Sequence, residues 1–405
     1  MDNLLQQKIE ARTQLLGHQI FEQSRLNPLG KGFWISKIME LATGNARVKT
    51  QLFRFVDVLP VLKTPAQRKD HLIEYLQAPS SKTKWPMILR VATAMMRVPF
   101  INRGVVSLSD FQVRQMANHF IVGETLDEAL PKITARREHG LAFTLDILGE
   151  AVVAEDEAQH YYDRYLELIE GLGARSLKEH PILDRSSLGS IPPVNISVKI
   201  SALDCRVDSV AYQTSLDRLE QKLVPLMATA QKNGVFINFD MEQFALKELF
   251  RDLFKRLISR PEFKSYRHWG IVVQAYLRSA EEDVRDWIQF AKERGTPFTI
   301  RLVKGAYWDY EKIVADQNGW ECPVFLKKSE SDASFENCAR LLLEAYPHIE
   351  LAVGSHNIRS IAYCLATAEA LGLASNALEI QMLFGMAEPF KQALVKMGYR
   401  VREYD

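Results

Sequence analysis

Residues 299–308 combine the pattern of a buried strand with side chains that could do chemistry directly after it. Residues 299–303 are β-branched and apolar except for Arg301, and a buried charge needs a partner because leaving it unpaired is very costly. Residues 304–308 then offer a lysine for a phosphate, a glycine for close approach of backbone to a ligand, and two aromatics for stacking on a flat ring. A bound ligand would partner the arginine. The alternative is a strand end whose arginine pairs with a core carboxylate and whose aromatics only pack.

Other predicted strands also end in polar residues. In a barrel of parallel strands the carboxyl ends meet at one face, which is where active sites lie. Seven strands ending this way favour a site over isolated helix caps or loop anchors. The residues in question are Lys199 and Ser201, Asp240 and Glu242, Gln274 and Tyr276, Arg301 and Lys304, Ser355, His356 and Asn357, Gln381 and Leu383, and Tyr404.

The residue types form a coherent set. Lys304 and His356 suit a pyrophosphate, and amides such as Gln274 can donate to and accept from the edge of a heteroaromatic ring. Asp240 and Lys199 would address a small charged substrate. A flavin with a zwitterionic substrate fits this set, and a nucleotide or a sugar phosphate would fit almost as well. A pair of glycosidase carboxylates fits less well, because the candidate acids share one strand.

The chain changes pattern near residue 141. Residues 1–140 read as helices, with apolar positions at three- and four-residue spacing in 33–41 and 52–62 and a buried apolar helix over 85–100. Beyond them, β-rich runs alternate with helical ones. Eight strands are predicted, at 143–148, 196–201, 236–240, 271–276, 299–304, 351–355, 378–383 and 399–404. We therefore expect an α/β fold with an all-helical arm domain (1–140) and a (βα)8 TIM-type barrel (141–405).

The sequence ends at Asp405, directly after the eighth strand, so the final helix of such a barrel is missing. An uncovered strand would leave an apolar face exposed. We expect the gap to be filled by a longer natural chain, by another chain, or by an N-terminal helix that folds back.

Composition excludes several classes of function. The 405 residues contain 51 lysines and arginines against 50 acidic residues, without the basic excess typical of nucleic-acid binding. The four scattered cysteines form no metal or disulfide pattern, which fits a reducing cytoplasm. The N-terminus lacks the features of a signal peptide, and no apolar run is long enough to span a membrane.

The same residues resemble the proline dehydrogenase part of the bifunctional proline utilization A (PutA) flavoenzymes. The most specific motif covers residues 300–308, with support from 196–203, 237–240, 273–276, 356–357 and 381–386. Residues 49–57 resemble the PutA helical arm, which favours PutA over single-function proline dehydrogenases. The resemblance implies FAD and oxidation of L-proline to Δ1-pyrroline-5-carboxylate, with electrons passed to a quinone.

By matching position, the resemblance also implies the site residues. The substrate pocket and chemistry would fall to Lys199, Asp240, Arg301, Tyr307, Leu383 and Tyr404. FAD would be held by Asp240, Gln274, Arg301, Val303, Lys304, Gly305, Ala306, Tyr307, Trp308, Lys328, Ser355, His356, Asn357 and Gln381.

In the family the last barrel helix carries an arginine pair for the proline carboxylate, and this sequence ends before it. We expect the N-terminal part of a longer PutA that also oxidises glutamate semialdehyde, in the cytoplasm or peripheral to a membrane, with a homo-oligomer as one expected state. The alternative is an FAD-binding fragment or assembly module with impaired catalysis.

Overall fold

The computed structural model describes residues 3–25, 64–76, 121–149, 152–175 and 177–405, together with residues 51, 54, 58 and 62. The chain divides into two compact units, Met1–Ser24 with Val122–Asp405, and Arg25–Ile121. In the second unit the structure describes helix α4 (Pro65–Leu76). The helices predicted at 33–41 and 85–100, and most of the one at 52–62, lie outside the described residues. Among the described residues, no helix has the length and apolar character needed to cross a membrane.

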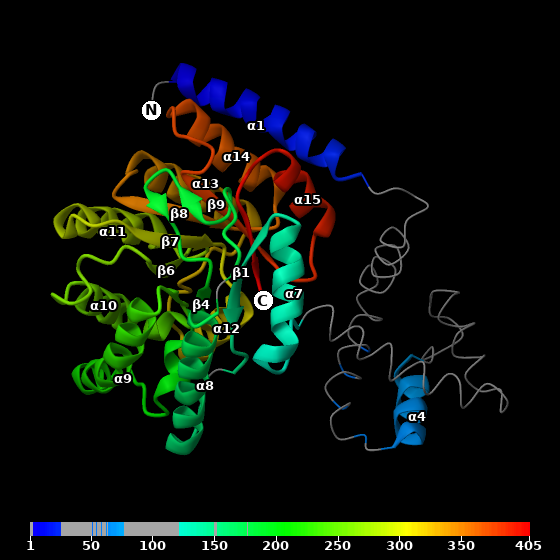
Figure 1. Cartoon of the computed structure of the whole chain (residues 1–405), viewed down its shortest axis with the longest axis vertical. Coiled ribbons are helices and arrows are strands. Elements are labelled where there is room, and N and C mark those ends of the chain that lie inside the picture. The colour runs from blue at the N-terminus through cyan, green and yellow to red at the C-terminus, as the bar shows by residue number, and fades with distance from the viewer. Residues whose placement is uncertain are drawn as a thin grey trace. The chain divides into compact units, whose positions relative to one another are not determined.

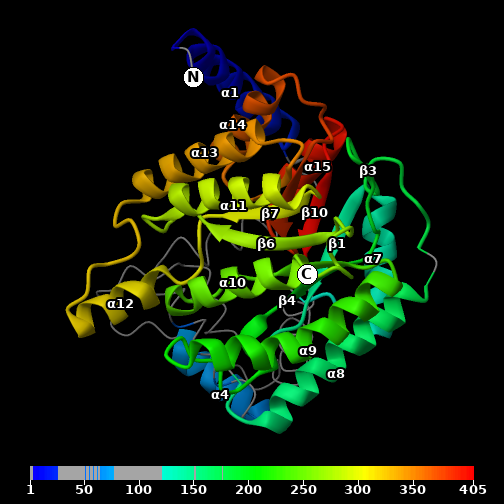
Figure 2. The same ribbon diagram turned by 90° about the vertical axis from the view of Figure 1, so that its left-hand side faces the viewer.

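The larger unit is built on a closed barrel of eight parallel strands (Figures 1 and 2). All eight predicted strands are present, with boundaries that shift by a few residues. They are β1 (Leu141–Asp146), β4 (Asn195–Val198), β5 (Phe236–Phe239), β6 (Trp269–Gln274), β7 (Phe298–Val303), β8 (Ile349–Gly354), β9 (Leu378–Leu383) and β10 (Val401–Tyr404). The barrel closes where β1 pairs with β10, with Leu141 opposite Val401 and Thr144 opposite Tyr404. A two-stranded hairpin, β2 (Arg185–Ser186) with β3 (Gly189–Ser190), was not predicted.

Helices connect successive strands around the outside of the barrel, as Figure 2 shows. They are α8 (Glu155–Gly173), α9 (Tyr212–Lys232), α10 (Lys247–Ile258), α11 (Ala280–Arg294), α12 (Trp308–Asn318), α13 (Lys328–Glu344), α14 (Ile358–Ala370) and α15 (Glu388–Lys396), with short 3-10 turns η3 (Ile200–Leu203) and η4 (Phe244–Leu246).

The strands alternate between the helices and the barrel interior. On β7, Ile300 and Leu302 are fully buried in the hydrophobic core, while Thr299, Arg301 and Val303 line interior cavities. This period of two explains how one arginine sits inside an apolar run.

A buried ion pair lies deeper inside the barrel. Glu379 of β9 accepts two hydrogen bonds from Arg402 of β10, at 2.7 and 3.0 Å. Burial opposes the charge of Glu379, but Arg402 and Arg400 outweigh it and lower the pKa of Glu379 to about 2. The carboxylate is therefore ionised throughout the neutral range.

The gap expected after the eighth strand is covered by helix α7 (Leu126–Glu138), which precedes β1. Arg136 of α7 forms a bidentate pair with Glu388 of α15 at 2.8 and 2.9 Å and lies 3.3 Å from Glu403 of β10. At its other end, Leu126 packs so close to α8 that a Cβ added at Gly171 would lie 2.7 Å from it. Helix α7 thus lies against α15, β10 and α8, where the eighth helix of a regular barrel would be. Of the three ways expected to fill the gap, an N-terminal helix folding back is the one observed.

Helix α1 (Asn3–Gln23) packs on α14 and α15. It buries Ile9, Leu16 and Ile20, and Arg12 pairs with Glu369 at 2.6 Å. Both α1 and α7 fall within the predicted arm of residues 1–140, yet both pack against the barrel. The division into arm and barrel at residue 140 stays a prediction.

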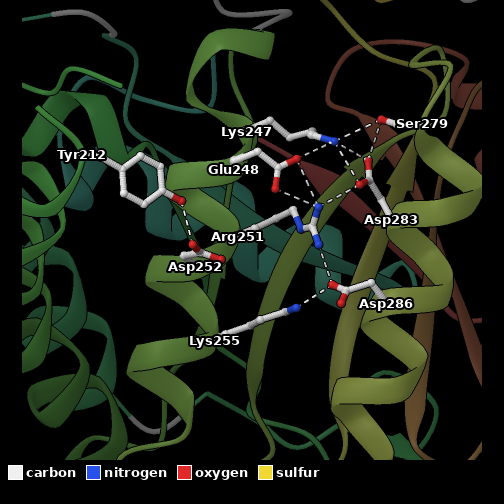
Figure 3. Close-up of polar contacts among 9 residues, drawn as sticks. All are labelled: Tyr212, Lys247, Glu248, Arg251, Asp252, Lys255, Ser279, Asp283 and Asp286. Carbon is white, nitrogen blue, oxygen red and sulfur yellow. Dashed lines mark hydrogen bonds and ion pairs between the residues drawn. The ribbon is translucent and has the colours of Figure 1, made fainter. Parts of the chain in front are cut away.

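An ionic network joins α10 to α11 (Figure 3). Lys247 donates to both oxygens of Asp283, at 2.8 and 2.9 Å. Arg251 bridges Asp283 and Asp286, at 2.9 and 2.5 Å. Because α10 follows closely on the loop that leaves β5, this network holds one wall of the site described next.

Candidate active site

A cavity of about 670 Å³ opens at the carboxyl ends of the barrel strands. Its volume is in the range of small-molecule and cofactor sites. Every residue expected from the resemblance lines it except Gln274 and Trp308. Of the other strand-end candidates, Glu242 lines the cavity, whereas Ser201 and Tyr276 do not. The predicted residues at the cavity are Lys199, Asp240, Arg301, Val303, Lys304, Gly305, Ala306, Tyr307, Lys328, Ser355, His356, Asn357, Gln381, Leu383 and Tyr404.

At the centre, Asp240 joins a cation and a phenol. Arg301, only 4% exposed, donates to Asp240 Oδ1 at 2.8 Å and to Ser197 Oγ at 3.1 Å. The Tyr404 hydroxyl donates to Asp240 Oδ2 at 2.6 Å, and its ring lies 4.8 Å from the Arg301 guanidinium carbon. Burial and the charge of Asp240 raise the pKa of Tyr404 well above its usual value, so this phenol keeps its proton. Arg301 therefore has the core carboxylate of the alternative interpretation, and it also faces the cavity.

A second ion pair lies beside the first. Lys199 Nζ donates to Asp146 Oδ2, and the Lys199 amide donates to the Tyr165 hydroxyl at 3.1 Å. Burial and the charge of Asp240 raise the pKa of Asp146 to about 6, against the opposing effect of Lys199. Sequence reasoning missed Asp146. The available signal was its position at the carboxyl end of β1, the one strand for which no end residue was considered.

The loop after β5 is held from two sides. Glu242 accepts hydrogen bonds from the Ser201 amide, at 3.1 Å, and from the Ser201 hydroxyl. From β6, Gln274 Nε2 donates to the carbonyls of Met241 at 3.4 Å and Glu242 at 3.1 Å. Gln274 thus fixes the segment that carries Asp240. Its contact with a cofactor stays a prediction.

The backbone after β7 leaves room for a ligand to approach it closely. Gly305 has φ +132°, and a Cβ there would lie 2.5 Å from the ring of Tyr276. Trp308 begins α12 and donates from Nε1 to the Phe325 carbonyl at 2.8 Å. Its indole therefore packs beside the cavity without lining it, and its cofactor role also stays a prediction.

A carboxylate that the sequence did not reveal ties the two cavity lysines together. Asp332 of α13 accepts from Lys304, and from Lys328 at 2.6 Å. Burial opposes ionisation here, but the hydrogen bonds from these two lysines lower the pKa of Asp332. The lysines therefore lie on one side of the cavity, where a phosphate would meet both.

After β8, hydrogen bonds orient a histidine. Ser355 Oγ accepts from the Asn357 amide at 3.1 Å, and the Asn357 side chain caps α14 through the Ser360 amide at 3.2 Å. His356 Nε2 accepts from the Leu383 amide at 3.0 Å, so the ring proton is on Nδ1. Burial, with the charge of Lys391, lowers the pKa of His356 and keeps it neutral.

Several buried polar atoms at this cavity lack a partner among the described residues. Arg301 Nε and His356 Nδ1 are free donors, and Gln381 Oε1 is a free acceptor. Buried polar groups are nearly always hydrogen-bonded, so these atoms point to a polar ligand. With the two lysines and the bare backbone at Gly305, they match the phosphates and the ring edge of FAD. The residues present therefore fit that cofactor.

Comparison with known families gives matches over most of the chain. The Proline dehydrogenase family model matches residues 129–405, and the Proline utilization A N-terminal domain model matches residues 10–120. The two matches together cover residues 10–120 and 129–405, and the names of both models refer to proline.

Individual proteins that are similar to this chain carry names that agree with these family models. The bifunctional protein PutA of Klebsiella aerogenes is 32% identical over 73% of this chain and 22% of its own length. Proline dehydrogenase 2 of Bacillus subtilis is 28% identical over 72% of this chain and 81% of its own length. The crystal structure of PutA from Bdellovibrio bacteriovorus, inactivated by N-propargylglycine, is 42% identical with a TM-score of 0.85, over 100% of this chain and 39% of that one. This chain thus spans about a fifth of the length of the curated PutA relative.

Proposed function

Given that this chain belongs to the proline dehydrogenase family, we propose that it oxidises L-proline to Δ1-pyrroline-5-carboxylate with FAD as its cofactor. The observation that carries the proposal is that two ion pairs line one cavity. Arg301 pairs with Asp240, and Lys199 pairs with Asp146. Two cations and two carboxylates match a small zwitterion better than a ligand of one charge.

FAD, when bound, supplies the two-electron oxidant that accepts a hydride from the proline ring. The side chains supply position and charge. Arg301 places a buried positive charge in the cavity, and Asp240 and Tyr404 fix its orientation from two sides. Lys199 offers an ammonium to the substrate carboxylate, and Leu383 covers the substrate from β9. Holding both reactants in one orientation removes much of the entropic barrier to reaction.

The cofactor would be held along the walls of the cavity. Lys304, Lys328 and His356 would face the phosphates, where two cations and one N–H donor lie. Gly305 and Ala306 would bring backbone close to the cofactor, and Gln381 offers an acceptor to a ring edge. Val303, Tyr307, Ser355 and Asn357 complete the wall.

The test is an anaerobic titration of the purified chain with L-proline while the visible spectrum is recorded. We expect the oxidised flavin band to bleach. Pyrrolidine, which lacks the carboxylate, and cyclopentanecarboxylate, which lacks the nitrogen, serve as controls and should leave the band unchanged. A flavin that stays oxidised with L-proline would contradict the proposed reaction, and a chain that binds no FAD would contradict the proposed cofactor.

We also propose that the natural protein is longer, oxidises glutamate semialdehyde as well, and passes its electrons to a quinone. The match of residues 10–120 to the PutA N-terminal domain model supports this proposal. Re-oxidation of the reduced protein by a soluble quinone, against a nicotinamide nucleotide as control, tests the acceptor. A homo-oligomer, and a location in the cytoplasm or peripheral to a membrane, stay predictions.

A further inference from the structure

The side-chain amide of Gln381 has one end bonded and one end unbonded within the described part of the chain. Gln381 lies on β9, is 6% exposed and lines the cavity at the carboxyl ends of the strands. Its Nε2 donates to Glu379 Oε1 at 2.7 Å, whereas its Oε1 is buried and has no hydrogen bond from any described residue. A buried acceptor without a donor is costly, so this atom requires a donor from a ligand.

Glu379 determines which end of the amide is left for a ligand. It precedes Gln381 by two residues on the same strand, so both side chains face the barrel interior. Burial opposes the charge of Glu379, but Arg402 and Arg400 lower its pKa to about 2, so the side chain is an ionised carboxylate. An ionised carboxylate only accepts hydrogen bonds. If the amide turned over, Oε1 would face a carboxylate oxygen and Nε2 would lose its acceptor.

Glu379 is itself held in place. Arg402 donates to both of its oxygens, at 2.7 and 3.0 Å, and Arg400 Nε lies 3.1 Å from its Oε2. Two other titratable side chains line the same inner part of the barrel. Glu350 lies near Arg400, and burial lowers the pKa of His268 to about 3 and keeps it neutral. The carboxylate that receives Gln381 Nε2 therefore has a fixed position and a fixed charge.

An amide that offers only its acceptor selects a donor on the ligand. The ring of oxidised FAD carries one N–H, and carbonyl oxygens flank it on the same edge. A glutamine beside that edge can donate to a carbonyl or accept from the N–H, depending on how its amide is turned. Because Nε2 is bonded to Glu379, Gln381 offers Oε1 and suits the N–H.

We propose that Glu379 is a positioning residue for the cofactor, which fixes the Gln381 amide so that Oε1 accepts a hydrogen bond from the ring N–H of FAD. The inference rests on the proposed function, because it places FAD in this cavity. It has a measurable consequence. Ionisation of the ring N–H would leave an anion facing Oε1, so the fixed amide raises the pH at which this group ionises. An amide free to turn would donate from Nε2 to the anion and lower that pH.

The test is an alkaline titration of the FAD-loaded chain, without substrate, in which the visible spectrum reports ionisation of the ring. Glu379→Met combined with Arg402→Met frees the amide and removes one charge of each sign. Replacing a buried ion pair by apolar side chains of similar volume is often neutral for stability. We expect the ionisation pH to fall by roughly 1–2 units, as for one new hydrogen bond to a charged group.

Gln381→Leu completes a double-mutant cycle. Once the amide is gone, removing the ion pair should leave the ionisation pH unchanged. Cavity lysines that titrate in the same range are common to all four chains, so their effects cancel in the cycle. These lysines are Lys199, Lys304 and Lys328. A shift of equal size with and without Gln381 would mean that the ion pair acts only through its charges, and it would overturn the proposal. The absence of any shift would do the same.

The proposal stays testable if the double variant does not fold. Gln381→Leu alone leaves the ion pair intact and removes the acceptor, so its ring N–H should ionise roughly 1 pH unit below that of the wild type. An equal or higher ionisation pH would overturn the inference. Failure of the proposed reaction is distinguishable, because it leaves the flavin oxidised with L-proline and does not affect a titration that uses no substrate.

Discussion

Gly305→Ala should destabilise the chain and weaken FAD binding together. Gly305 lies at φ +132°, a region that L side chains rarely adopt. A Cβ at this position would lie 2.5 to 2.6 Å from three ring atoms of Tyr276. Tyr276 is 3% exposed and packed in the hydrophobic core, so its ring cannot swing away without moving its neighbours.

Backbone strain and the steric clash with Tyr276 together set the expected loss of stability. Holding alanine in a sparsely populated backbone region costs roughly 1–3 kcal/mol, and forcing an extra methyl into packed surroundings costs roughly 1–3 kcal/mol. We expect the free energy of unfolding to fall by about 2–6 kcal/mol, which at roughly 2–4 °C per kcal/mol lowers Tm by about 4–24 °C. FAD content should fall as well, because the same backbone faces the cavity.

The assay is thermal unfolding followed by circular dichroism, with FAD stoichiometry measured by absorbance. Gly295→Ala is the matched control. Gly295 also has a positive φ, +75°, but nothing lies within 4 Å of its added Cβ. That variant should cost only roughly 1–2 kcal/mol and retain FAD. If both variants unfold at the same temperature with the same FAD content, the reasoning from the Tyr276 contact is refuted.

Three further perturbations test other parts of the structure. Arg136→Ala removes the bidentate bond between α7 and α15 and should lower the free energy of unfolding in urea by roughly 1–3 kcal/mol; an equal loss in Arg175→Ala, whose ion pair is exposed, would contradict this role. Asp240→Ala leaves Arg301 buried without its carboxylate and should cost roughly 3–5 kcal/mol, so a change below roughly 0.5 kcal/mol would refute the pairing. Glu379 has a folded-state pKa of about 2, below its unfolded value, so its stabilisation is present above the unfolded pKa and is lost as pH falls toward 2. The difference in unfolding free energy between wild type and Glu379→Gln should shrink by roughly 3 kcal/mol between pH 6 and pH 2, and a constant difference would contradict the assigned pKa.

The barrel could be predicted because each strand is a short β-rich run between helical segments of ordinary length. Residues 298–303 were recognised as a strand although they contain a charged residue. Side chains alternate along a strand, and Arg301 occupies a position that faces the cavity inside the barrel. The placement of α7 could not be predicted. Its sequence shows an ordinary amphipathic helix, and its partners Glu388 and Glu403 lie more than 250 residues away in the chain. The hairpin at 185–190 was missed because strands of two residues carry no periodicity.

Most of the site followed from one rule, that polar residues at strand ends converge on one face of a barrel. The rule failed for Gln274 and Trp308, because position in a strand does not decide whether a side chain bonds to ligand or to backbone. It was not applied to the first strand, which was predicted at 143–148 but ends at Asp146 in the structure. The rule could not find Asp332, because this residue lies within helix α13, not at a strand end, and meets Lys304 only in the folded structure.

The pairing of β1 with β10 also has a consequence for the order of events during synthesis. Leu141 of β1 can contact Val401, and α1 can contact α14, only after these C-terminal segments have been synthesised. Contacts of such long sequence separation form slowly, because the loop between them must close first. As the chain emerges from the ribosome, α1 lacks its partner α14, and the edge of β1 that pairs with β10 lacks its partner, until the C-terminal part has been made, although β1 can pair with β4 earlier. Proteolysis of nascent chains should therefore cut before β1 more readily than within β5 to β8.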